Sequence, residues 1–186
     1  MKNEIKIDEV NITNWINSYL HLDLNEKCRK CIDGPAYVDM YHFTILWNLF
    51  EARVFDCNLH CNVTKIKETI TNNMNLQELE EEPIVGIVLH HLQNRYTHDG
   101  ETINGYNVLI NQSRDNRDRD WKDLLKNVLL GTNTDKIDMI TAIIIAIYRF
   151  RCNLFHGEKD IASLPNQNVN FDYSNKFIIA CLTHKK

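Results

Sequence analysis

Residues 134–157 read TDKIDMITAIIIAIYRFRCNLFHG, and this stretch decides the fold. Thr134 or Asp135 is a good helix N-cap and Gly157 is a natural stop, so we expect a helix that ends near His156. Its apolar side chains lie largely on one side, and a run of three isoleucines widens that stripe. A helix that is apolar on most sides is buried in a core or lies at a subunit interface.

Helical patterns recur along the rest of the chain. A first helix is expected over residues 12–22, with Asn11 or Thr13 as N-cap and an apolar face of Trp15, Ile16, Tyr19 and Leu20. Further helices are expected over residues 33–56, 83–95, 121–130 and 174–183. A shorter helix that contains Ile66 and Ile70 is expected to begin at a cap formed by Thr64. Residues 97–107 and 158–170 are expected to be loops, and no hairpin is expected. The pattern predicts an all-α helical bundle that forms one domain over residues 1–186.

The composition is that of a soluble globular protein. The 186 residues carry a net charge of −4, with 44% hydrophobic and 25% charged residues. This excludes a disordered chain and a basic protein that coats nucleic acid, although it permits a local basic site. Residues 1–10 contain no apolar signal-peptide core, and the longest apolar run, residues 143–147, is too short to span a bilayer. We therefore expect a cytoplasmic protein without a membrane partner.

Four of the six cysteines form two close pairs, Cys28 with Cys31 and Cys57 with Cys61. Two such pairs can supply the four ligands of a zinc site, as in a structural or DNA-binding domain. The helix expected between the pairs would hold them about 35 Å apart, since a helix rises 1.5 Å per residue. Reduced, partly buried thiols are the favoured alternative. We predict no metal and no cofactor.

Polar residues close the apolar helix, namely Arg149, Arg151, Asn153 and His156. On a helical wheel Arg149, Asn153 and His156 fall within about 60° of one another, whereas Arg151 lies roughly 140° from His156. One chain need not complete this cluster, and a two-fold packing of two copies would bring arginine and histidine together. The ordinary alternative is that these residues only cap the end of the helix.

The cluster suits cleavage of a phosphodiester bond in RNA. Histidine titrates near neutral pH, so it can take a proton from a 2′-hydroxyl or give one to a leaving oxygen. Arginine is always charged, and its planar guanidinium matches phosphate oxygens. RNA supplies its own nucleophile, the 2′-hydroxyl, so this chemistry requires no metal.

Two stretches resemble one known family. Residues 151–159, RCNLFHGEK, resemble the Arg-x4–6-His signature of the HEPN superfamily, many of whose members read Arg-Asn-Asn-Leu-Phe-His-Gly. Residues 43–51, FTILWNLFE, are similar to a tryptophan-containing helix with a following acidic residue in some bacterial HEPN proteins. The resemblance covers the chain from about residue 30 onward. It implies a HEPN-like helical bundle and a homodimeric, metal-independent endoribonuclease that acts on RNA. Such proteins occur as toxins and in anti-phage defence, so an antitoxin or another regulatory partner is also implied.

The resemblance also assigns roles to residues. Arg151 would bind and polarise the scissile phosphate, His156 would be the general acid–base, and Asn153 would orient the site. Three residues are candidates for a supporting or substrate-binding role: Glu51, Arg149 and Lys159.

Two features of the motif leave alternatives open. Arg149 also has a permitted spacing to His156, although the Asn-Leu-Phe-His-Gly context favours Arg151 as the motif arginine. The position after that arginine is usually polar in the family, whereas here it is Cys152. The alternative function is a non-catalytic helical module for dimerisation or for binding RNA or another partner.

Overall fold

The computed structural model describes residues 35–110, 119–155 and 167–186. Within these residues the chain is mostly helical, as predicted, with one short antiparallel hairpin. The helices are α3 Pro35–Val54, α4 Val63–Asn73, α5 Leu76–Glu81, α6 Pro83–Tyr96, α7 Asn104–Ile110, α8 Arg119–Leu129, α9 Lys136–Phe155 and α10 Asn168–Thr183. The hairpin strands are β1 Thr97–His98 and β2 Glu101–Thr102. None of the described helices is both long and apolar enough to cross a membrane.

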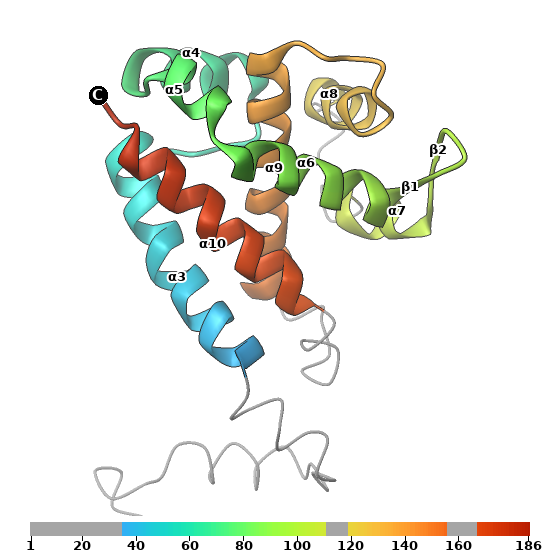
Figure 1. Ribbon diagram of the computed structural model, residues 1–186, viewed down its shortest axis with the longest axis horizontal. Helices are drawn as coiled ribbons and strands as arrows, with labels where there is room; N and C mark the ends of the chain where they lie inside the picture. Colours follow the sequence, from blue (N-terminus) through green and yellow to red (C-terminus); the bar gives the residue numbers. More distant parts are fainter. Residues whose placement is uncertain (1–34, 111–118, 156–166) are drawn as a thin grey trace, which may run out of the picture.

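Helix α9 runs through the middle of the molecule (Figure 1). Every side chain from Ile140 to Ile147 is at most 1% exposed, because α4, α6, α7 and α8 all pack against this helix. The Asp135 side chain caps its start by accepting a hydrogen bond of 2.9 Å from the backbone N–H of Asp138. The predicted helix and its burial are confirmed. Its middle is covered by helices of the same chain rather than by a second subunit.

Helices α3 and α10 lie side by side along one flank of the molecule (Figure 1). An aromatic cluster joins them to the core. The Phe43 ring lies 5.2 Å from the ring of Phe171 on α10, and the Trp47 ring lies 6.0 Å from the ring of Tyr148 on α9. This cluster holds α3 against α9 at Tyr148, close to the polar end of α9.

The expectation of a loop over residues 97–107 is wrong. Asp99 and Gly100 both have positive φ angles, 50° and 76°, which is the backbone of a two-residue hairpin turn. This turn brings Thr97 opposite Thr102. Helix α7 then begins at once and buries Tyr106 and Leu109 against the core.

Three other boundaries differ from those expected. Helix α4 is capped by Asn62 rather than Thr64, because the Asn62 side chain accepts the Lys65 backbone N–H at 2.9 Å. The acidic run before Pro83 lies largely in a helix of its own, α5. Helix α10 begins at Asn168, six residues before the expected start.

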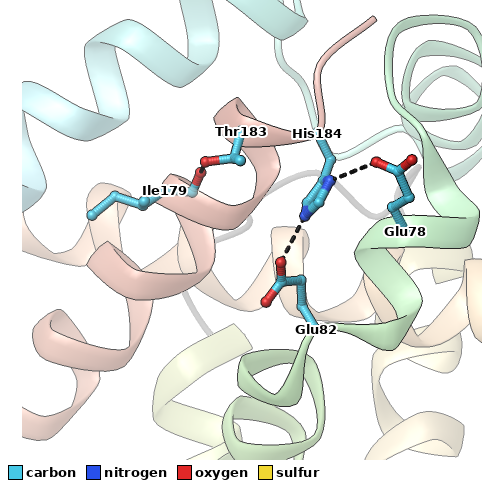
Figure 2. Close-up of polar contacts among 5 residues, drawn as sticks. All are labelled: Glu78, Glu82, Ile179, Thr183 and His184. Carbon is cyan, nitrogen blue, oxygen red and sulfur yellow. Dashed lines mark hydrogen bonds and ion pairs between the residues drawn. The ribbon is translucent and has the colours of Figure 1, made fainter.

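The end of the described chain is tied to the α5–α6 junction (Figure 2). The His184 Nε2 atom lies 2.7 Å from a Glu82 carboxylate oxygen, and its Nδ1 atom lies 3.1 Å from one of Glu78. The hydrogen bonds with Glu82 and Glu78 raise the pKa of His184 above its ordinary value. The backbone adds a further bond, since Asn75 N–H donates to the His184 carbonyl at 2.8 Å. We call this arrangement the C-terminal clasp.

Candidate functional site

The candidate site lies at the C-terminal end of α9, where two arginines occupy different environments. Arg149 is only 6% exposed, and its Nε–H donates to the Leu109 carbonyl at 3.1 Å. Its guanidinium carbon also lies 5.7 Å from the centroid of the Trp121 ring, within the range of a cation–π interaction. Arg149 therefore holds the end of α7 and the start of α8 against α9.

Arg151 is half-buried on the side of α9 that carries Tyr148, whose ring faces α3. Burial raises the pKa of Tyr148 and the neighbouring thiol of Cys152 raises it further, whereas the positive charge of Arg151 lowers it. These effects show that Tyr148, Arg151 and Cys152 lie close together. The wheel argument that Arg149 and Arg151 point in different directions agrees with this arrangement.

Asn153 lies one helical turn after Arg149, on the same side of α9, and is 2% exposed. Two buried polar atoms on this side have no hydrogen-bond partner among the described residues: Nη2 of Arg149 and Oδ1 of Asn153. An unsatisfied buried polar group costs about 1–3 kcal/mol, so native proteins keep few of them. A donor and an acceptor are thus left open next to the position where His156 follows in the sequence.

Glu51 lies on α3, next to the aromatic cluster, and is half-buried. Its carboxylate accepts the indole N–H of Trp47 at 2.9 Å. Because the Trp47 ring also touches that of Tyr148, Glu51 is joined through two aromatic rings to the Arg151 side of α9. Residues 43–51 thus contact α9 at Tyr148, three residues before Arg151.

The structure brings together part of the predicted site. Arg149, Arg151 and Asn153 share the last turns of α9, whereas the Glu51 side chain is hydrogen-bonded to Trp47 on its own helix, α3. His156 and Lys159 lie outside the described residues, so their roles stay predictions. The partners of Arg149, which are Leu109 and Trp121, were not foreseen. An arginine in an apolar helix signals that some acceptor must reach it, but the sequence gives no indication of which carbonyl does so.

The cysteine pairs are only half described. Cys57 is exposed and Cys61 is half-buried in the segment after α3, whereas Cys28 and Cys31 lie outside the described residues. Cys152 and Cys181 are buried on α9 and α10, where they pack in the interior. No group of metal-binding side chains is present among the described residues.

Comparisons of the chain with known protein families, with curated proteins and with solved structures find no match.

Proposed function

We propose that this protein is a cytoplasmic, metal-independent endoribonuclease with a HEPN-like fold, which acts on RNA as a homodimer in a toxin or anti-phage role. The observation that carries the proposal is the open pair of buried polar atoms at the end of α9, Nη2 of Arg149 and Oδ1 of Asn153. Arg149 is seven residues and Asn153 three residues before His156, at the end of a helix whose middle is buried and almost wholly apolar. Polar groups are costly to bury without partners, so this end of the helix is built to engage further polar groups.

The proposed reaction uses the nucleophile that RNA carries. His156 takes the proton of a ribose 2′-hydroxyl as its oxygen attacks the adjacent phosphorus, which forms a 2′,3′-cyclic phosphate. The bond from phosphorus to the 5′-oxygen of the next nucleotide breaks, and that oxygen receives a proton from the second histidine of the dimer. Arg151 binds the phosphate and stabilises the negative charge that develops on it. Asn153 orients the reacting groups.

Single-stranded or loop RNA is the proposed substrate, because an unstacked backbone can reach the in-line geometry of this attack. The net charge of −4 opposes binding of the whole protein surface to RNA. Binding is therefore confined to the arginine-containing site, and we expect RNA affinity to fall steeply as salt rises.

The test is cleavage of an end-labelled RNA hairpin with a long single-stranded loop, in buffer with EDTA. We expect the wild type to cleave, and His156→Ala and Arg151→Ala to lose about 10²- to 10⁴-fold in rate. The matched controls are His98→Ala, whose side chain is 79% exposed at the end of β1, and Arg53→Ala on the exposed side of α3. Both controls should cleave at the wild-type rate.

A wild type that is folded and dimeric by light scattering but leaves the RNA intact would contradict the proposal. Cleavage at an undiminished rate by His156→Ala would contradict it as well. The alternative, a helical module that binds RNA or another partner without cleaving it, is favoured by the burial of Cys152, which is 6% exposed. A buried thiol fills space where the resemblance leads us to expect a polar side chain. Unchanged RNA binding without cleavage is the result expected of that module.

A further inference from the structure

Helix α3 has two apolar faces, and only one of them is covered. The inner face carries Phe43, Trp47, Phe50 and Val54, each at most 1% exposed. The outer face carries Val38, Tyr41, Ile45 and Leu49, which are 50%, 63%, 42% and 45% exposed. We call these four residues the outer α3 face. At 100° per residue they form one stripe about 80° wide, on the side of the helix opposite the buried residues.

The outer α3 face continues into a groove between α3 and α10. Eight residues line this groove: Asp39, His42, Ile45, Leu46, Asp172, Asn175, Lys176 and Ile179. Ile45 belongs to both surfaces, and Ile179 on the α10 side is 51% exposed. In Figure 1, α3 lies at the outer edge of the molecule beside α10. A contiguous row of half-exposed apolar side chains of this kind is typical of a surface that another element covers.

We propose that the outer α3 face is the docking surface for the chain's own residues 12–22, which the structure does not describe. These residues form a strongly amphipathic sequence. On a helical wheel Ile12, Trp15, Ile16, Tyr19, Leu20 and Leu22 fall within an arc of about 160°, and the polar residues occupy the rest. The segment therefore offers an apolar face that matches the uncovered apolar outer α3 face.

Length and connectivity favour this occupant over a separate molecule. A helix over residues 12–22 is about 15 Å long, and the distance along α3 from Val38 to Leu49 is about 16 Å. The connecting residues 23–34 span at most about 40 Å, which is enough for the chain to turn back and run antiparallel to α3. Because the segment is tethered next to its target, its effective concentration is on the order of millimolar, well above that of a free partner.

The experiment is hydrogen exchange, followed by mass spectrometry, on the full chain. We expect the amides of residues 12–22 to be protected in the wild type, and the double variant I45K/L49K to speed their exchange at least about tenfold. The matched control is I87K/V108K, which places the same charges at positions on α6 and α7 that are 46% and 56% exposed. This control should leave the protection of residues 12–22 unchanged.

The reciprocal variant tests the segment from its own side. W15A/Y19A should leave the outer α3 face uncovered and raise the binding of a dye that reports exposed apolar surface. The proposal is overturned if residues 12–22 exchange freely in the wild type, or if I45K/L49K leaves their protection unchanged. It is also overturned if I45K/L49K halves the mass measured by light scattering while residues 12–22 stay protected, because the face then binds a second copy.

Discussion

Replacing Arg149 with lysine should destabilise the protein although the charge is kept. In the structure the Arg149 Nε–H satisfies the carbonyl of Leu109, in the last turn of α7, where the helix leaves carbonyls without partners. A lysine side chain has no N–H at this position, and its compact ammonium does not match the flat face of the Trp121 ring. The substitution therefore removes one contact with α7 and weakens one with α8.

The magnitude follows from these two contacts. A buried hydrogen bond from a charged donor contributes about 1.5–3 kcal/mol, and a desolvated cation–π pair at this distance contributes about 1–2 kcal/mol. Lysine keeps part of the second contribution. We therefore expect Arg149→Lys to lower the free energy of unfolding by about 2–3 kcal/mol, a large share of the stability of a domain of this size.

Urea unfolding followed by far-UV circular dichroism measures this change. The midpoint should fall while the slope of the transition stays the same, because the folded state remains compact. The matched control is Arg53→Lys on the exposed surface of α3, which should change the unfolding free energy by less than about 0.5 kcal/mol. A loss below about 0.5 kcal/mol for Arg149→Lys would refute the structural role of this guanidinium.

Three further substitutions test other contacts. Glu51→Leu leaves a buried indole N–H without its acceptor and should cost about 1–2 kcal/mol in urea unfolding, whereas Glu51→Gln keeps an acceptor and should cost less. His184→Gln removes the ion pairs with Glu82 and Glu78; because these raise the pKa of His184, their stabilisation is full below the ordinary pKa of 6.5 and is lost as pH rises through the higher folded-state value. At pH 6 the variant should be only about 0.5–1 kcal/mol less stable than wild type, because solvent screens these partly exposed ion pairs. At pH 9 the two proteins should be equally stable, and an equal difference at both pH values contradicts this expectation. Gly131→Ala forces a side chain into a backbone with φ of 71° and should lower Tm by a few degrees, at a cost of about 1 kcal/mol.

The helices that the sequence predicts well are those with a regular apolar period and a clear cap. Helix α9 has both, and α3, α6 and α8 have the apolar period. Gly131, which follows α8, has a positive φ, as is typical of a glycine after the end of a helix. The hairpin was missed because its strands have two residues each, too few for an alternating pattern, although Asp99 and Gly100 are a typical turn pair. The first turn of α10 has a contact that is distant in sequence, since the Asn170 side chain lies 2.7 Å from the Nε2 atom of His91 on α6.

The candidate site also has features that the sequence predicts and features that only the structure shows. The sequence alone indicates the end of α9 as the candidate site, because Arg149, Arg151 and Asn153 interrupt an apolar pattern. It does not separate the roles of the two arginines, since the acceptor of Arg149 lies forty residues away in the chain, at Leu109. The Trp47–Glu51 hydrogen bond joins residues one turn apart on α3, whereas the contact of the Trp47 ring with Tyr148 cannot be predicted until α3 is placed against α9.

The pairing of α3 with α10 affects how the protein is made. Among the described helices, the first to be synthesised has the last as its principal neighbour, so this contact joins residues more than a hundred positions apart. While the ribosome is still translating the middle of the chain, the Phe43 and Trp47 rings lack their partners Phe171 and Tyr148. A nascent chain halted before α10 displays them to chaperones and proteases. Completion of the flank formed by α3 and α10 is thereby deferred until translation is nearly over.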